Sequence, residues 1–209
     1  MRRITQITLV IAFFVLVLFA ASVARAVTLT YDDLPTTQNQ GGQRWDDVPA
    51  SYGGLNWTGW EVANGSDYKS VYGNSYTSSS GNFAYNGDGV RCVSTAGSLF
   101  NFLGADFSTW AQNNAFQSFS SKTVTVEGYR DATLVNSDSW NLVSNAFVLH
   151  TVTGFDNIDT LVIKSDGDGR WFAMDNFEYT AVAVPEPSTM LLLSSGLLGL
   201  VALRRKLKK

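Results

Sequence analysis

The residues that most often carry out catalysis are scarce in this 209-residue chain, which has His150 as its single histidine and Cys92 as its single cysteine. A Ser-His-Asp triad or a Cys-His pair would have to use His150, which lies in a strand-like stretch and is expected to be structural. The count excludes a zinc site built from several histidines or cysteines. A glycosidase needs two carboxylates about 5–10 Å apart, and no spacing singles out such a pair. The sequence therefore predicts a non-catalytic protein, with a glycan-acting hydrolase as an alternative.

Aromatic side chains are concentrated between residues 45 and 85, among glycine, asparagine and serine. Flat rings beside amide groups suit sugars, because a sugar has an apolar face and a rim of hydroxyls. The candidate glycan-binding aromatics are Trp45, Tyr52, Trp57, Trp60, Tyr72 and Tyr76. Packing in a core is the alternative, and we expect it for at least half of the rings in this region. Trp57 and Trp60 are three residues apart, so they cannot share one face of a regular strand.

The elements that must position these residues are predicted to be strands. Short aromatic and β-branched segments, such as 122–129, 160–164 and 171–179, are separated by turn residues such as Asn64-Gly65 and Asp166-Gly167-Asp168-Gly169. This pattern is typical of an all-β protein. The sequence predicts a single antiparallel β-sandwich domain over residues 27–180.

The N-terminus has the pattern of an export signal. Arg2 and Arg3 precede an apolar run over 7–21, and Ala24-Arg25-Ala26 fits a small-residue cleavage site. We expect residues 1–26 to be a signal peptide with a signal helix, cleaved after Ala26 at the Ala24/Ala26 motif. An uncleaved N-terminal anchor is the alternative.

The C-terminal segment 181–209 has a second apolar run. Pro185, Glu186 and Pro187 are followed by uncharged residues 189–203 and then by a basic tail. A helix over 189–203 would be about 22 Å long, at ~1.5 Å per residue. That is short for a hydrocarbon core of about 30 Å, but flanking lysines and arginines can reach the interface. We expect a transmembrane helix here, with a buried core helix as the alternative.

This tail resembles the PEP-CTERM sorting signal of bacterial surface proteins, with Pro185, Glu186 and Pro187 as the sorting motif. The resemblance implies processing by an exosortase-type enzyme. It also implies export, transient anchoring in the inner membrane, and a final location at the cell surface or in the extracellular matrix, associated with exopolysaccharide. The basic flanks of both apolar runs agree, because they place residues 27–184 outside the cytoplasm.

The charge of the central region argues against a nucleic acid partner. Residues 27–184 contain 7 basic and 17 acidic residues, a net charge of −10. Nucleic-acid-binding domains need a basic surface to meet phosphates.

Two segments of the domain resemble known β-sandwiches. The stretch Val48–Trp57 resembles a P-x-x-Y-G-G-x-x-W segment of extracellular sandwiches that carry this tail, and Phe172–Tyr179 resembles the last strand of jelly-roll carbohydrate-binding modules. The resemblance implies a jelly-roll-like fold and a structural Ca²⁺ shared by Asp32 or Asp33 and Asp175. Ordinary strand-end acids are the alternative. We therefore expect a non-catalytic exported surface or extracellular-matrix protein; a specific carbohydrate-binding module is the alternative.

Overall fold

The computed structural model describes residues 25–73, 81–87, 91–95, 98–111, 119–144 and 146–182. The signal helix, the helix at 189–203, the sorting motif and Ala24 therefore lie outside the described residues, as does Tyr76. No helix within the described ranges is long and apolar enough to cross a membrane. Ala24–Val182 form one compact unit.

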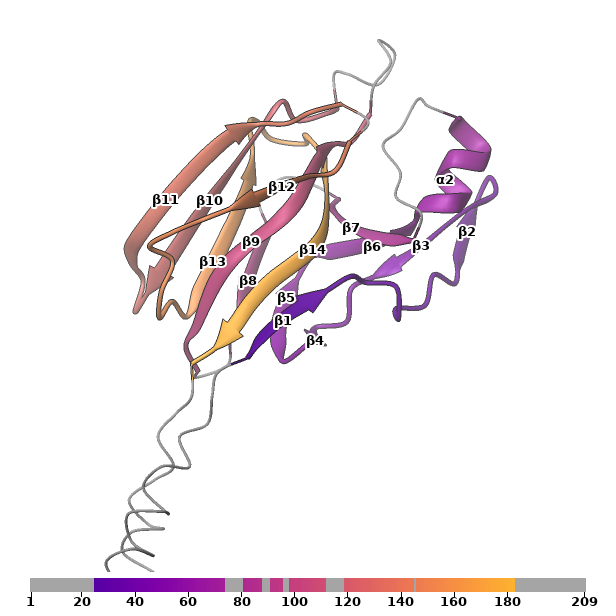
Figure 1. The fold of residues 1–209 in the computed structure, drawn as a ribbon. Helices are drawn as coiled ribbons and strands as arrows, with labels where there is room; N and C mark the ends of the chain where they lie inside the picture. Colours follow the sequence, from indigo (N-terminus) through magenta and orange to yellow (C-terminus); the bar gives the residue numbers. More distant parts are fainter. Residues whose placement is uncertain are drawn as a thin grey trace, which may run out of the picture. The chain divides into compact units, whose positions relative to one another are not determined.

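The strands form two antiparallel sheets that face each other (Figure 1). Sheet A has eight strands in the order β12 (Val148–Thr151), β9 (Phe100–Thr109), β14 (Phe172–Ala181), β7 (Asn82–Asn86), β6 (Trp60–Asn64), β3 (Gln43–Asp47) and β2 (Gln38–Gln40), with β1 (Ala26–Leu29) also paired to β14. Sheet B has six strands in the order β11 (Thr133–Asn141), β10 (Thr123–Arg130), β13 (Thr160–Ser165), β8 (Arg91–Ser94), β5 (Leu55–Thr58) and β4 (Ser51–Tyr52). The structure confirms the prediction of an all-β antiparallel sandwich.

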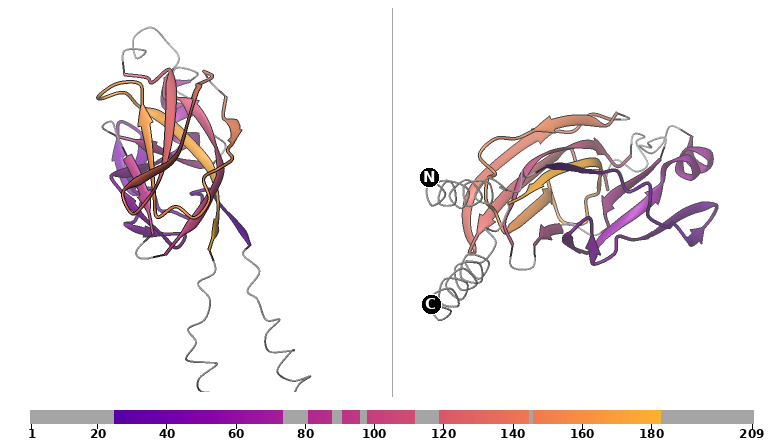
Figure 2. Two further views of the ribbon diagram at one scale, coloured as in Figure 1. Left: turned by 90° about the vertical axis from the view of Figure 1, so that its left-hand side faces the viewer. Right: turned by 60° about the horizontal axis from the view of Figure 1, so that its bottom comes forward.

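The first and last strands of the domain are neighbours. β1 pairs antiparallel with β14, and Ala26 lies opposite Thr180. The start of β1 and the end of β14 consequently lie at one end of the sandwich, as two views show (Figure 1, Figure 2). Helix α2 lies at the other end.

The main hydrophobic core fills the space between the sheets. Trp60 and Val62 of β6 are buried there with Trp57 of β5, and Trp57 packs edge-on against Trp60 with their ring centroids 5.8 Å apart. Val124 and Val126 of β10 alternate with more exposed neighbours, as a half-buried strand requires. Burial of these side chains is the main stabilising contribution that the sequence offers, since a single cysteine can form no disulfide within the chain.

A second hydrophobic cluster covers the outer face of sheet A. Every residue of β7 is buried, because Ala84 belongs to the core between the sheets whereas Phe83 and Tyr85 point the other way. The members of this outer cluster are Ala63, Tyr68, Phe83, Tyr85, Trp110, Ala111 and Ala173.

Helix α2 (Gly65–Tyr72) supplies part of that cover, although the sequence pattern predicted only a turn at Asn64-Gly65. Asn64 caps its N-terminus by accepting a hydrogen bond from the Asp67 amide at 3.1 Å. Tyr68 and Tyr72, one helical turn apart, lie on the same side of α2 and pack into the outer cluster. The helix ends at Gly73, whose φ of 60° suits glycine.

Candidate functional site

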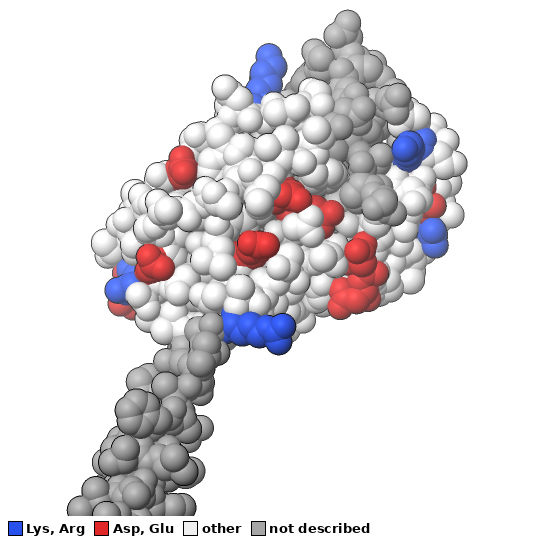
Figure 3. Space-filling model, viewed as in Figure 1, with Lys and Arg blue, Asp and Glu red and all other residues white. Residues whose placement is uncertain are grey.

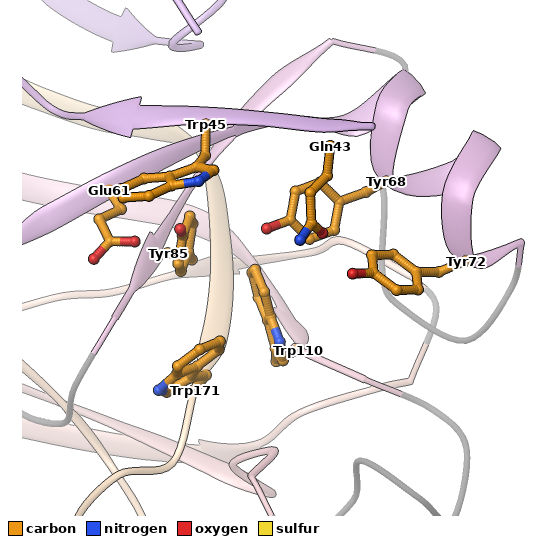
Figure 4. Close-up of a pocket in the computed structure, with 8 residues that line it drawn as sticks. All are labelled: Gln43, Trp45, Glu61, Tyr68, Tyr72, Tyr85, Trp110 and Trp171. Carbon is orange, nitrogen blue, oxygen red and sulfur yellow. The ribbon is translucent and has the colours of Figure 1, made fainter. Parts of the chain in front are cut away.

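A small aromatic pocket opens beside α2 on the outer face of sheet A. Its cavity measures about 200 Å³. It is lined by Gln43, Trp45, Glu61, Tyr68, Tyr72, Tyr85, Trp110 and Trp171 (Figure 4). Pockets for drug-sized ligands usually measure about 300–1,000 Å³, so this one fits a single ring or a pendant group.

Strand register brings these residues together from distant parts of the chain. Gln43 and Trp45 share one face of β3, since they are two residues apart. Ala63 of β6 lies opposite Trp45, and Tyr85 of β7 lies opposite Glu61. The small Ala63 side chain leaves open space between the large rings on this face.

The floor of the pocket is buried and its walls are partly exposed. Tyr68, Tyr85 and Trp110 are buried, and the Tyr85 and Trp110 ring centroids are 4.5 Å apart. Trp171 meets Trp110 edge-on at 5.2 Å. Trp45, like Trp171, is only partly buried, so both can offer surface to a ligand. Figure 4 shows the rings arranged around a common hollow rather than in a single stack.

The polar part of the lining is centred on Glu61. Burial raises the pKa of Tyr85, and its neighbour Tyr68 and a hydrogen bond with Glu61 act in the same direction. The Glu61 carboxylate also lies close to Gly87, because a Cβ built there would be 2.4 Å from Oε1. Gly87 therefore leaves the space that this carboxylate occupies.

The sequence candidates separate into different environments. Trp45 and Tyr72 line the pocket. Trp57 and Trp60 are buried between the sheets, with exposed fractions of 3% and 1%, so they are packing residues that a ligand cannot reach. Tyr52 packs against the same core and donates a hydrogen bond from its hydroxyl to Asp33 at 2.6 Å.

Trp110, Trp171, Gln43 and Glu61 contribute to the pocket but were not identified from the sequence. Trp110 follows β9 and Trp171 precedes β14, far from the aromatic-rich region in sequence. Their positions next to strand ends were the available signal. A position next to a strand end does not say which strands are neighbours in the sheet, so it could not predict that these side chains share a pocket.

The calcium candidates lie near the junction of β1 and β14, since Asp32 and Asp33 follow β1 and Asp175 lies within β14. One face of the molecule has acidic side chains across its middle and basic ones toward its margins (Figure 3). The pKa of Asp175 is raised to about 7, mainly by burial and to a smaller extent by the nearby carboxylates of Asp32 and Asp106. The Asn176 amide partly opposes this through a hydrogen bond to Asp175 at 2.8 Å. Tyr31, which precedes Asp32, has a buried hydroxyl with no hydrogen-bond partner among the described residues.

The candidate ligand atoms of these residues are oxygens, which calcium prefers. Its carboxylates are nevertheless engaged, since Asp32 accepts the Asn82 amide at 2.8 Å and Asp33 accepts the Tyr52 hydroxyl. Within the described ranges, no three acidic, histidine or cysteine side chains are grouped to hold a metal ion. Calcium binding at Asp32, Asp33 and Asp175 stays a prediction, and Asp32 and Asp175 are the pair that interact.

His150 lies on β12 and stacks on Trp140, with ring centroids 4.6 Å apart. Burial lowers its pKa, which Asp106 and Asp138 partly offset. The contacts of this histidine are those of a packing residue.

Comparison with known proteins identifies the C-terminal tail. Residues 183–206 match the family model described as the PEP-CTERM protein-sorting motif. This match confirms the prediction made from Pro185, Glu186 and Pro187, and it implies export and processing by an exosortase-type system. A search of curated proteins found no match to the sequence.

Comparison with solved structures concerns the fold. A DUF4465 family protein from Bacteroides caccae is 9% identical, with a TM-score of 0.53, and the match covers 76% of this chain and all of that one. The family 29 carbohydrate-binding module CBM29_1 from Piromyces equi is 11% identical, with a TM-score of 0.35, and the match covers 77% and 92% of the two chains. The first similarity shows a shared fold, and the second is too weak to support any further statement.

Proposed function

We propose that this protein is a non-catalytic surface protein that binds a saccharide in the aromatic pocket and so associates with extracellular polysaccharide after export. The observation that carries the proposal is the pocket itself. Six aromatic rings, one amide and one carboxylate surround a cavity of about 200 Å³. Rings can stack on the apolar face of a sugar, and Gln43 and Glu61 can hydrogen-bond to its hydroxyls.

The position of the pocket supports binding at a surface. Strands β3 and β6 and helix α2 lie at the end of the sandwich away from the start of β1 and the end of β14 (Figure 1, Figure 2). The chain continues from the end of β14 into the sorting motif. A pocket at the opposite end of the domain is well placed to meet a polymer when the domain is held through its C-terminus.

The positions of the carboxylates near Glu61 fit a protein that binds a saccharide without hydrolysing it. Asp47 lies directly opposite Glu61 on the neighbouring strand, so these two acids are side by side on one face of sheet A. Glycosidases place their two carboxylates on either side of the scissile bond. An assay for new reducing ends tests this point. Sugar release by the wild type that disappears in Glu61→Gln would show that the pocket hydrolyses its ligand, and it would contradict a non-catalytic function.

The binding test compares pocket variants with a matched aromatic control. Trp45→Ala and Trp171→Ala should each weaken binding of an oligosaccharide panel to the full-length protein in detergent by about thirtyfold, the ratio that roughly 2 kcal/mol produces at 25 °C. Tyr129→Ala, on β10 of the other sheet, should leave affinity unchanged. Calorimetric titration measures the affinities. Equal affinity in all four proteins, or no binding to any member of a broad panel, would contradict the proposal.

A further inference from the structure

The pocket combines aromatic faces with negative charge. Glu61 is the charged residue among the eight that line it, and no lysine or arginine is among them. The face of an aromatic ring carries partial negative charge and attracts cations, with tryptophan the strongest of the three aromatic residues. Both parts of the lining therefore favour a positively charged group over a neutral one.

Asp47 provides a second carboxylate beside Glu61. It lies directly opposite Glu61 in the antiparallel pairing of β3 with β6, so the two side chains share one face. Like charges in this position destabilise a sheet. A bound cation would relieve that repulsion, which is a reason for the pair to persist at a binding site.

The nearby basic residue Arg44 already has a carboxylate partner. It lies between Gln43 and Trp45 on β3 and forms an ion pair with Asp67 of α2. Its charge is matched there, away from the Asp47–Glu61 pair.

The Glu61 carboxylate is held in place by its neighbours. Tyr85 hydrogen-bonds to it, and the backbone at Gly87 lies against it. A carboxylate is an acceptor with about four lone-pair sites, and an ammonium group carries the N–H donors that suit it. Hydrogen bonds from an ammonium to a carboxylate are about twice as strong as neutral ones.

We propose that the sugar bound in this pocket is an amino sugar with a free ammonium group, stacked on the tryptophans with its nitrogen toward Glu61. This inference rests on the proposed saccharide-binding function and specifies its ligand class. A primary ammonium donates hydrogen bonds that Glu61 can accept, whereas a quaternary ammonium has no N–H and would use only the rings. A partly or fully de-N-acetylated hexosamine polymer provides such groups along its length.

The test compares two tetrasaccharides that differ in one substituent. At about pH 5.5, where an aliphatic amine is protonated, the full-length protein in detergent is titrated with glucosamine tetrasaccharide and with its fully N-acetylated counterpart. The wild type should bind the amine form about tenfold more tightly, the ratio that roughly 1.4 kcal/mol produces. Glu61→Gln keeps the size and a polar contact to Tyr85 but removes the charge, so most of the tenfold preference should be lost, and the rings and Asp47 should account for what remains.

The control is Glu178→Gln on β14, which removes the same charge outside the pocket and should keep the tenfold preference. Melting curves of both variants check that they fold. Equal binding of the two sugars by the wild type, or a preference that is undiminished in Glu61→Gln, would overturn the inference and leave saccharide binding standing. Binding of tetramethylammonium as tight as that of the amino sugar would overturn the sugar assignment. Failure of both sugars and of a neutral panel to bind would instead remove the proposed function.

Discussion

At the scale of single residues, the surroundings of Asp175 change its acid–base chemistry. Its pKa is raised to about 7, mainly by burial and then by Asp32 and Asp106. An aspartate in an unfolded chain has a pKa of about 3.9. The folded protein therefore binds this proton more tightly than the unfolded chain does, and the group contributes stability below about pH 4 that is lost as the pH rises through about 7.

We expect the wild type in chelator to lose stability between about pH 4 and pH 7, and Asp175→Asn to remove most of this dependence. Calcium should reverse the loss at neutral pH if Asp175 and Asp32 bind it. The gain would be about 2.7 kcal/mol at a free concentration 100 times the dissociation constant, or several degrees at roughly 2–4 °C per kcal/mol. Asp33→Asn should keep the calcium effect, because Asp33 accepts the Tyr52 hydroxyl instead. Melting temperatures that ignore millimolar calcium in all three proteins would remove the metal assignment.

At the scale of elements, α2 links the aromatic pocket to the start of the domain through asparagines. Asn64 caps the helix and donates from Nδ2 to Asn82 at 3.1 Å. Asn82, which is buried, donates in turn to the carbonyl oxygens of Tyr31 and Leu34 at 3.2 and 2.9 Å. The helix that carries Tyr68 and Tyr72 is thus held by the same amide network that orders the chain after β1.

Asn64→Ala should lower the free energy of unfolding by about 1 kcal/mol for the lost cap, and it should weaken saccharide binding because Tyr68 and Tyr72 lose their fixed position. Asn64→Asp keeps the capping oxygen and loses only the bond to Asn82, so it is the matched control and should be milder in both measurements. Urea unfolding and calorimetric titration provide the two values. An unchanged affinity in a destabilised Asn64→Ala protein would show that the cap does not position the pocket.

At the scale of the whole molecule, one end of the sandwich carries the start of β1 and the end of β14, and the other carries the pocket. β1 closes against β14 through the register Ala26 to Thr180, so the predicted cleavage site at Ala26 and the segment before the sorting motif are neighbours. Export and sorting act on this end of the domain. Ligand binding is proposed at the opposite end, so processing need not disturb the pocket.

Replacing Pro185, Glu186 and Pro187 by alanine should leave the full-length protein in the inner membrane of a host with an exosortase system, because the matched motif is lost. Changing Ser194 and Ser195 to alanine keeps that motif and is the control. Fractionation and the apparent mass of the protein measure the outcome. A triple variant that reaches the surface at the same size as the wild type would contradict a sorting role for these residues.

The sequence by itself determined the class of fold and the sorting tail. Side chains alternate between the two faces of a strand, and turns use a small set of residue types. Short aromatic and β-branched segments such as 122–129 and 160–164 could therefore be recognised as strands without a structure. The tail was recognisable because its motif and apolar run are contiguous in sequence.

Only the tertiary structure decided which aromatic side chains can meet a ligand. Alternation divides a strand into two faces, but it does not say which face is covered by the other sheet. That choice depends on pairings between strands distant in sequence, and these placed Trp60 in the core while Glu61, the next residue, faces the pocket. Trp110 and Trp171 joined Trp45 there because β9, β14, β7, β6 and β3 are neighbours in sheet A. Such long-range pairings are stabilised by the packing of the complete domain, and no local stretch of the sequence encodes them.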